Sequence, residues 1–340
     1  MTSDHITRGK STSPSVAVVG AGLAGLVCAD TLTRAGCRVV VFDKGRFPGG
    51  RLASRSRDEN CFDYGAQYFT TKTSEFKNFL EPYLLSGEVA KWDGRFARLV
   101  DGCLSAETDQ KPRYVSVPLM RSLADDLSSA VDCKLSHRVL ELSRASNAKW
   151  SIIGNVESSV PPKEFSVGEF DFVVLNTPPA QANQLHRSPA LDEVVLRPCL
   201  AQLLSFNEPI NFNWDGVVLN DKILSWIARD SSKPGRPSGE RWVVHASPGW
   251  SEENFQTDEN VIQKLMIDRF ATIVPVNHSS LTFAKLHRWK FALPVSPVGP
   301  ACVYDPTAAI IYCGDWCVTA RVEGAYLSGI AAAEKIIGCA

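Results

Sequence analysis

The stretch of sequence that decides the fold reads V-A-V-V-G-A-G-L-A-G at residues 16–25, R-V-V-V-F-D-K at residues 38–44 and P-G-G-R at residues 48–51. The apolar residues before Gly20 predict a buried parallel strand, followed by a helix. Glycines at this spacing allow a tight turn at Gly20, close approach of a pyrophosphate at Gly22 and close helix–strand packing at Gly25. Asp43 ends the second strand, where a carboxylate can accept hydrogen bonds from a ribose. The stretch therefore predicts a dinucleotide-binding βαβ unit.

The bulk composition is that of an ordinary globular protein. The chain has 340 residues, of which 44% are hydrophobic and 21% charged, and its formal net charge is −1. This near-neutral balance argues against nucleic acid or an anionic membrane surface as the main partner. No apolar run reaches the roughly 18 residues of a membrane span. The ten cysteines include no C-x-x-C pair, which disfavours a zinc ribbon or a disulfide scaffold and suits a reducing compartment. No metal site is predicted.

The first residues differ from the rest of the chain. Residues 1–14 are polar, rich in Ser and Thr, and contain no apolar segment typical of a secretory signal. We therefore expect a disordered tail there and an intracellular protein, either cytoplasmic or organellar.

The rest of the chain contains predicted helices, strands and loops. Helices are predicted at residues 23–35, 74–85, 120–130, 258–273 and 322–337, and a helix or loop at 180–185. Strands are predicted at residues 16–19, 38–43, 135–142, 150–153, 170–175 and 310–313, with strand-like pieces in 89–104. The Pro/Ser/Gly-rich residues 158–168 and the polar residues 230–240 predict loops. The middle of the chain predicts short strands at residues 201–206, 216–219, 226–229 and 242–246.

A strand and helix typical of a parallel sheet therefore reappear at the C-terminal end of the chain. Two sequential domains would not explain this return, so we expect an interleaved α/β architecture. A Rossmann-like domain is predicted from residues 15–75, 115–183 and 300–340. A mixed or antiparallel β-sheet substrate domain is predicted from residues 76–114 and 184–299.

Four blocks of sequence together resemble the amine-oxidase-like FAD flavoprotein superfamily. They are residues 20–43, the P-G-G-R turn with D-Y-G-A at 63–66, residues 170–179, and residues 312–329. Within the superfamily, R-W-V-V-H-A-S-P-G-W-S at residues 241–251 and H-R-W-K-F-A at residues 287–292 resemble the renalase-like group. The implied fold is a two-domain flavoprotein, with a Rossmann-like FAD-binding domain and a substrate domain.

The resemblance also implies which residues bind the cofactor. The pyrophosphate would lie on the first glycine turn, the adenosine ribose on Asp43, the ribityl chain near Asp315 and the flavin near the start of the last helix, whose dipole would face the flavin N1/C2 oxygen. The guanidinium of Arg51 would meet phosphate oxygens, and Asn176 departs from the Ala usual there. The full set is Gly20, Gly22, Leu23, Ala24, Gly25, Asp43, Lys44, Gly50, Arg51, Leu52, Asp63, Gly65, Ala66, Gln67, Val139, Asn176, Thr177, Pro178, Gly314, Asp315, Val322, Glu323 and Ala325. The Cys-Tyr block of covalent attachment is absent, so FAD should bind non-covalently.

The resemblance further implies a substrate. Monoamine and polyamine oxidases commonly place an aromatic residue two positions before the Glu-Gly-Ala of the last helix, and this chain has Arg321 there. A guanidinium beside the substrate disfavours a cationic amine and favours an anion. The renalase-like group oxidises dihydronicotinamide dinucleotide isomers, passing a hydride to flavin N5 with oxygen as acceptor. The candidate substrate residues are Tyr68, Trp226, His245, Trp289 and Arg321.

Three alternatives stay open at this point. One is a flavin amine oxidase, or another FAD-dependent oxidase or desaturase. The second, of a different class, is a non-catalytic binding module like the Rab escort and GDP-dissociation-inhibitor proteins, which resemble this fold. The third is a plain NAD-dependent dehydrogenase, which the glycine fingerprint alone would permit. The Gly314-Asp315 and Val322–Ala325 blocks disfavour the third, because a nicotinamide enzyme has no need for a second set of contacts there. The oligomeric state stays undetermined.

Overall fold

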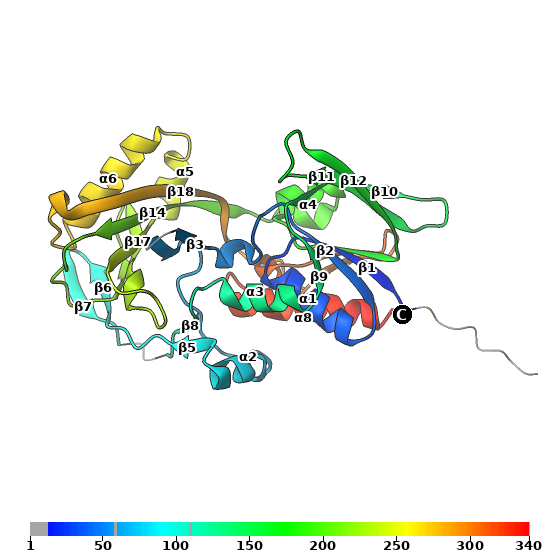
Figure 1. Cartoon of the computed structure of the whole chain (residues 1–340), viewed down its shortest axis with the longest axis horizontal. Coiled ribbons are helices and arrows are strands. Elements are labelled where there is room, and N and C mark those ends of the chain that lie inside the picture. Colours follow the sequence, from blue (N-terminus) through cyan, green and yellow to red (C-terminus); the bar gives the residue numbers. More distant parts are fainter. Residues whose placement is uncertain (1–12, 58–59, 109–110, 340) are drawn as a thin grey trace, which may run out of the picture.

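The computed structural model describes residues 13–57, 60–108 and 111–339. Residues 1–12, where a disordered tail is predicted, lie outside this range. The chain forms two lobes, and a pair of long strands runs along the upper side of one lobe toward the other (Figure 1). Among the described residues, no helix is both long enough and apolar enough to cross a membrane.

The first lobe is built on a six-stranded sheet that is assembled from distant parts of the chain. In spatial order its strands are β19 (Val303–Asp305), β20 (Ile310–Tyr312), β13 (Phe172–Leu175), β1 (Ser15–Val19), β2 (Arg38–Phe42) and β9 (Asp132–Lys134). All neighbours are parallel except β19 and β20. The C-terminal strand β20 thus pairs with β13 of the middle segment, which gives the interleaved arrangement expected for a doubly wound fold.

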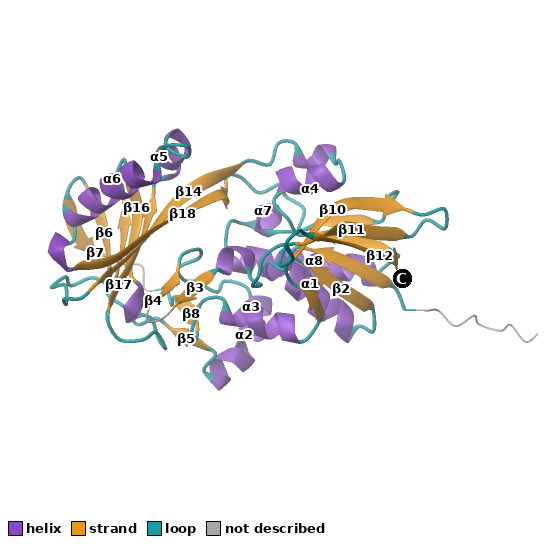
Figure 2. Cartoon of the chain, turned by 45° about the horizontal axis from the view of Figure 1, so that its top comes forward, coloured by secondary structure: helices purple, strands orange, loops and turns teal. Residues whose placement is uncertain are grey.

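Both faces of this sheet are covered, as a parallel sheet requires. Val16 and Val18 face the helices α1 (Leu23–Arg34) and α8 (Val322–Ile337), together with α3 (Ser122–Ser129). Ala17 and Val19 face the other way, toward a three-stranded antiparallel sheet of β10 (His137–Arg144), β11 (Trp150–Val156) and β12 (Lys163–Phe170). Figure 2 shows the strands β10, β11 and β12 beside this lobe's parallel sheet. The alternation of side chains along β1 therefore explains why all four residues are apolar.

The predicted loop at residues 158–168 is wrong, because β12 begins at Lys163. This strand lies at one edge of its sheet and pairs in antiparallel register with β11, for example Gly154 with Phe165. Most of its side chains are exposed, so it lacks the apolar alternation that marks a strand in sequence. The backbone hydrogen bonds of β11 extend it, and this non-local pairing overrides the turn-forming composition.

The second lobe is a seven-stranded mixed sheet. Its strands in order are β18 (Leu281–Pro294), β14 (Leu196–Phe206), β17 (Glu240–Ala246), β16 (Leu224–Arg229), β15 (Gly216–Leu219), β6 (Phe96–Val100) and β7 (Cys103–Ala106). Helices α5 (Pro248–Glu253) and α6 (Glu259–Ala271) belong to this lobe, and Ile262, Met266 and Phe270 of α6 enter its core. The strand prediction here is too short. β14 begins before Ala201, and β18 pairs with it along its whole length where no strand is predicted.

The remaining strands and α-helices lie outside the three sheets described above. They are β3 (Ser54–Arg57), β4 (Asn60–Asp63), α2 (Ser74–Ser86), β5 (Val89–Lys91), β8 (Tyr114–Ser116), α4 (Pro179–Leu185) and α7 (Asp315–Val318). Helix α2 falls in the predicted substrate domain, but its Phe76 and Leu80 are fully buried in the core that contains α1 and α8. The Phe76 ring lies 5.2 Å from that of Tyr326 in α8. Helix α2 therefore packs with the first lobe.

Candidate functional site

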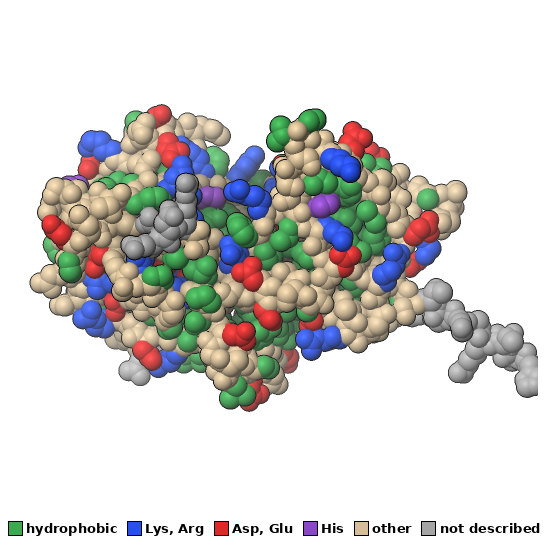
Figure 3. Space-filling model, in the orientation of Figure 1, with side chains coloured by type: hydrophobic (Ala, Val, Ile, Leu, Met, Phe, Trp, Pro, Cys, Tyr) green, Lys and Arg blue, Asp and Glu red, His purple; other side chains and the backbone are tan. Residues whose placement is uncertain are grey.

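A cavity of about 1060 Å³ lies where the two lobes meet. One end is lined by the carboxyl ends of β1, β2 and β13, which is where doubly wound sheets bind ligands. The other end is lined by side chains of β16, β17 and β18 from the second lobe. Figure 3 shows a notch between the lobes, with Lys, Arg and His side chains beside it. The cavity is thus long, and each lobe supplies one end.

The first end presents the amino terminus of α1. Gly20 adopts φ +110°, and a Cβ there would lie 2.5 Å from the backbone oxygen of Asn176, so only glycine fits. A Cβ at Gly25 would lie 2.2 Å from the oxygen of Gly20. The first turn of α1 holds no acidic residue, and no side chain caps it. Its backbone N–H groups are therefore left for an anionic ligand such as a pyrophosphate.

Asn176 lies against all three glycines of the fingerprint. Its Nδ2 donates a hydrogen bond to the oxygen of Gly20 at 3.2 Å. The same nitrogen lies 3.0 Å from the position that a Cβ of Gly22 would occupy, and 2.6 Å from that of Gly25. Beside it, the buried hydroxyl of Thr177 has no protein partner among the described residues. A polar ligand at this end of the cavity would satisfy that hydroxyl.

Asp43 lines the cavity beside the same turn and also organises it. Its Oδ2 accepts a hydrogen bond from the backbone N–H of Ala21 at 2.7 Å, and its Oδ1 accepts one from Gly45 at 2.6 Å. Each carboxylate oxygen keeps a lone pair for a ribose hydroxyl. Val139 of β10 lines the wall next to this position, together with His137.

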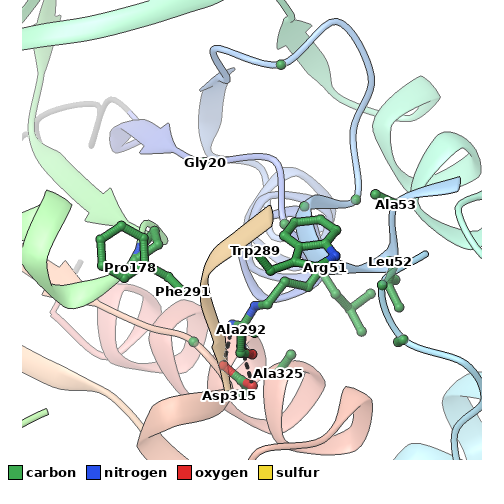
Figure 4. Close-up of a pocket in the computed structure, with 18 of the residues that line it drawn as sticks. Gly20, Arg51, Leu52, Ala53, Pro178, Trp289, Phe291, Ala292, Asp315 and Ala325 are labelled. Carbon is green, nitrogen blue, oxygen red and sulfur yellow. Dashed lines mark hydrogen bonds and ion pairs between the residues drawn. The ribbon is translucent and has the colours of Figure 1, made fainter. Parts of the chain in front are cut away.

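The Arg51 guanidinium is paired with a carboxylate of this chain. It forms a two-pronged ion pair with Asp315, with Nη1–Oδ2 at 2.9 Å and Nη2–Oδ1 at 2.5 Å. Its Nη1 also donates to the backbone oxygen of Ala292 at 3.0 Å (Figure 4). Arg51 therefore links the P-G-G-R turn, α7 and β18, three segments that line the cavity, while both charged side chains still line it.

Asp63 does not line the cavity. It is fully buried among Lys233 at 3.2 Å, Arg236 at 2.5 Å and Ser54 at 2.6 Å. Burial opposes ionisation of Asp63, but the charges of Lys233 and Arg236 outweigh it and lower the pKa of its carboxyl to about 2. Lys233 also contacts Asp230 at 2.5 Å, and burial raises the pKa of Asp230.

This buried cluster lies behind the cavity wall. Lys233 Nζ reaches Oε1 of Gln67 at 3.3 Å, and Gln67 in turn donates to the backbone oxygens of Asp63 and Gly65. Gly65, Ala66 and Gln67 line the cavity. The cluster therefore supports the shape of this wall segment without facing a ligand.

Glu323 is also outside the lining, although it lies in the first turn of α8. Its side chain is buried, and its Oε1 accepts hydrogen bonds from the backbone N–H of Thr73 at 2.6 Å, the hydroxyl of Thr73 at 2.8 Å and the N–H of Lys72 at 3.1 Å. Glu323 therefore ties α8 to the start of α2. Its neighbours Val322 and Ala325 face the cavity instead.

Replacing Glu323 with Gln should lower the free energy of unfolding by about 2 kcal/mol, because charge-assisted hydrogen bonds from buried groups are weakened. Chemical denaturation measures this change. Glu334→Gln is the control, since Glu334 is exposed on the same helix and its replacement should change stability by less than about 0.5 kcal/mol. Equal losses in the two variants would contradict this role for Glu323.

All five candidate substrate residues line the cavity. They are Tyr68, Trp226, His245, Trp289 and Arg321, and the rings of Tyr68 and Trp226 lie 5.6 Å apart. Trp226 and His245 are directly opposed on the antiparallel strands β16 and β17. Arg321 is the residue that immediately precedes α8. The fold thus brings together residues that are far apart in sequence.

Three further aromatic residues that line the cavity were not predicted. Tyr64 stacks on Trp289 at 5.4 Å and lies 4.6 Å from His287, and Phe291 also lines the cavity. The indole Nε1 of Trp289 donates to the backbone oxygen of Tyr64 at 3.0 Å. The signal for His287 was its alternation with Trp289, which places both on one face of a strand.

The charge of the cavity is uneven. Of the described residues that line it, only Asp43 and Asp315 carry carboxylates, whereas eight are basic: Lys44, Arg46, Arg51, Arg121, Arg138, Arg288, Lys290 and Arg321. Both histidines of the second end are neutral at neutral pH, because burial lowers the pKa of His245 to about 4 and, with the charge of Lys285, that of His287 to about 4. The cavity therefore suits anionic occupants.

Comparison with known proteins supports this description. Residues 18–83 match the NAD(P)-binding Rossmann-like domain, and residues 108–337 match the flavin containing amine oxidoreductase family. Cyclohexylamine oxidase from Brevibacterium oxydans is similar in structure, with a TM-score of 0.72, 11% identity, and 96% and 100% of the two chains covered. Putrescine oxidase bound to putrescine is similar too, with a TM-score of 0.70, 11% identity, and 96% and 99% covered.

One curated relative matches only a short segment. The small chain of the NADPH-dependent glutamate synthase of Escherichia coli is 56% identical over 43 residues, which are 13% of this chain and 9% of that relative.

These matches narrow the alternatives. The amine oxidoreductase match spans more than half of the chain, and neither a plain NAD-dependent dehydrogenase nor a non-catalytic escort module fits it. The glycine turn, the basic lining and the unpartnered Thr177 hydroxyl fit FAD as the cofactor. The chain belongs to the flavin-containing amine oxidoreductase family, and is an FAD-dependent oxidoreductase.

Proposed function

We propose that the protein oxidises a dihydronicotinamide dinucleotide isomer, as the renalase-like group does, with oxygen as the final electron acceptor. The observation that carries this proposal is the composition of the second end of the cavity. It combines aromatic faces and two neutral histidines in a cavity that Arg321 also lines, and the only carboxylates among the described lining residues are Asp43, beside the α1 turn, and Asp315, paired with Arg51. An alkylammonium substrate would find no counter-ion there, whereas a planar ring carrying phosphates would find stacking partners and a cation.

FAD is proposed to bind non-covalently along the first end. Its pyrophosphate would lie on the α1 amino terminus near Leu23 and Ala24, and its adenosine ribose on Asp43. Arg51 and Asp315, held to each other, would border the ribityl chain together with Gly314. Lys44, Gly50, Leu52 and Pro178 complete the proposed contacts.

The reaction requires little proton chemistry from the protein. Bound FAD would supply a two-electron acceptor for the hydride, with oxygen as the proposed final acceptor. The C–H bond that breaks is on the dihydropyridine ring, and loss of hydride leaves an aromatic pyridinium without removal of a proton. The proposed step therefore needs neither His245 nor His287 as a base. The tasks left to Tyr68, Trp226 and Trp289 are to orient the ring and to exclude water.

The runner-up is a flavin amine oxidase, which the putrescine and cyclohexylamine oxidases of similar fold favour. Tyr64, Trp289 and His287 could form an aromatic wall for an uncharged amine.

Anaerobic reduction of the flavin separates the two proposals. The FAD-loaded protein is mixed with putrescine, cyclohexylamine, NADH, NADPH and their isomers reduced at the other ring carbons. We expect the absorbance near 450 nm to bleach with the isomers and not with the amines. Bleaching by an amine, with none by any dihydronicotinamide, would overturn the proposed function.

Arg321 is expected to bind the charged part of the substrate. Arg321→Gln should raise KM for the dinucleotide by about 10-fold and leave kcat nearly unchanged, because an interaction present in both ground and transition states is lost. Arg321→Lys should keep part of the affinity. The control substrate is the ribosyl dihydronicotinamide without phosphates, whose KM should be the same for Arg321→Gln and for the wild-type protein. An equal rise in KM for both substrates in Arg321→Gln would show that Arg321 does not contact the phosphates.

A further inference from the structure

A buried cation lies against the ring of Tyr68 in the cavity wall. The guanidinium carbon of Arg113 is 5.0 Å from the centre of the Tyr68 ring and 3.9 Å from the centre of the Phe96 ring. Tyr68 lines the cavity, whereas Arg113 is buried and does not line it. Arg113 therefore borders the cavity through the ring of Tyr68.

The backbone brings these two side chains together. Phe69 and Tyr114 form an antiparallel bridge, in which each N–H donates to the carbonyl oxygen of the other at 2.9 and 2.8 Å. Tyr68 and Arg113 each precede one residue of this bridge. Because successive side chains alternate between the two faces, both lie on the face opposite to the bridge pair, as diagonal neighbours.

Glu107 holds the guanidinium in this place. Its carboxylate pairs with Nη2 of Arg113, and the two side chains are only 10% and 9% exposed. Arg98 contacts the other oxygen of Glu107 at 3.3 Å, but half of its side chain is exposed. Because the guanidinium of Arg113 is largely removed from water, its attraction to the two ring faces is stronger than at an exposed site.

The other ring neighbours of Tyr68 are two tryptophans. The centres of the Trp92 and Trp226 rings lie 6.4 and 5.6 Å from that of Tyr68, and both rings are tilted against it. The attraction between a cation and an aromatic ring is directional, since it is largest with the cation over the ring face. Arg113 therefore favours one orientation of the Tyr68 ring.

We propose that Arg113 is a positioning residue for the oxidation: its guanidinium, held by Glu107, fixes the plane of the Tyr68 ring in the cavity wall. The inference rests on the proposed function in one respect, because it takes Tyr68 to contact the substrate. It applies to a dihydronicotinamide and to an amine alike, since the ring is held from outside the cavity. A ring face that is fixed in advance loses less entropy when a substrate packs on it.

Fluorine NMR tests the orientation of the ring without a substrate. The FAD-loaded protein is labelled with 3-fluorotyrosine, and Tyr68→Phe identifies the Tyr68 signal by its absence. The wild-type protein should give one narrow Tyr68 signal. In Arg113→Met this signal should broaden or split, because the ring adopts more than one orientation. A signal of unchanged width would overturn the proposal.

Anaerobic flavin reduction tests the effect on the reaction. The quantity measured is the second-order rate constant for the substrate that bleaches the flavin. Tyr68→Leu should lower it about 10-fold and Arg113→Met about 5-fold, since the wall is lost or disordered. The double variant should be no slower than Tyr68→Leu alone, because Arg113 acts only through Tyr68. Independent effects would multiply to about 50-fold, and that result would overturn the proposal.

Two further variants separate positioning from a loss of structure. Arg113→Lys should recover most of the rate and the narrow signal, because an ammonium keeps the attraction to the ring and to Glu107. Arg98→Met removes the exposed partner of Glu107 and should change neither measurement. If Arg113→Met fails to fold because it leaves the Glu107 carboxylate unpaired, Glu107→Gln/Arg113→Met replaces it and removes both charges.

Failure of this proposal differs from failure of the proposed function. Reduction of the flavin by an amine alone would overturn the proposed function, and the double-variant comparison is then made with that amine. If no compound reduces the flavin, the proposed function fails, and the NMR signal decides whether Arg113 fixes the ring. Reduction by a dihydronicotinamide with independent effects of the two substitutions would overturn the role of Arg113 and uphold the proposed function.

Discussion

Asn176→Asp should weaken FAD binding by about 100-fold. The side-chain amide lies against Gly20, Gly22 and Gly25 at the amino terminus of α1, where the pyrophosphate is proposed to bind. A carboxylate there would face two phosphate charges at close range, and like charges about 5 Å apart at an effective dielectric constant near 20 repel by about 3 kcal/mol each before screening. Titration of the apoprotein with FAD, followed by flavin fluorescence, gives the dissociation constant.

The control for this substitution is Asn176→Ala. It removes the hydrogen bond to Gly20 without adding charge, so it should weaken FAD binding only a few-fold. The difference between the two variants should shrink as the salt concentration rises, because the repulsion is screened. Stability of the apo Asp variant should change little, since attraction to the α1 terminus offsets the lost hydrogen bond. Equal FAD affinities of the Asp and Ala variants would show that the pyrophosphate does not bind next to Asn176.

Lys233→Met should lower the free energy of unfolding by about 3–5 kcal/mol. The Lys233 ammonium is fully buried between the carboxylates of Asp63 and Asp230. Removing it leaves buried negative charge without compensation, and breaking such a pair is far more costly than replacing the whole pair. Denaturation by urea of the FAD-saturated protein measures the loss.

The matched control is Lys264→Met. Lys264 also contacts an aspartate, Asp268, at 2.5 Å, but both side chains are largely exposed. An exposed ion pair contributes about 0–1 kcal/mol, so this variant should be nearly as stable as the parent protein. Adding Asp230→Leu to Lys233→Met should recover part of the loss, because it removes one of the uncompensated charges. A loss at Lys233 as small as that at Lys264 would show that the cluster does not stabilise the fold.

The same cluster gives a direction for the dependence of stability on pH. The pKa of Asp63 is lowered to about 2 from an ordinary value of 3.8. Its contribution to stability is therefore present above about pH 4 and is lost as the pH falls toward 2. His245 and His287 affect the stability of the protein at a higher pH than Asp63 does. Their pKa values are lowered to about 4 from 6.5, so the unfolded chain binds protons first and stability falls between about pH 6.5 and 4.

The local sequence pattern was sufficient to predict the helices and strands that have a strong hydrophobic periodicity. The βαβ unit at residues 16–43 could be predicted because its strands are buried on both faces and its glycines have a fixed spacing. Strand β12 could not, because an exposed edge strand has no apolar alternation and is held by the backbone of β11. The length of β18 was missed for a related reason, since its pairing partner β14 lies about 85 residues earlier in the chain.

The site shows the same division. Types of residues at known motif positions could be predicted, and most of the predicted residues line one cavity. The direction in which a side chain points could not. Arg51 turns to Asp315, Asp63 turns away into an ion cluster with Lys233 and Arg236, and Glu323 turns to Lys72 and Thr73. Each of these partners is distant in sequence, and no local rule ranks it against a bound ligand.

By itself, the sequence determined the nucleotide-binding βαβ unit, the return of the chain to that sheet at its C-terminal end, and FAD rather than NAD as the expected cofactor. The first two follow from glycine spacing and side-chain periodicity, whereas FAD is what the resemblance of the Gly314-Asp315 and Val322–Ala325 blocks to the flavoprotein superfamily implies. Only the tertiary structure decided which charges are neutralised by one another. The physical reason is that burial and pairing depend on contacts between segments far apart in the chain, as between Asp63 and Lys233 or between Arg51 and Asp315.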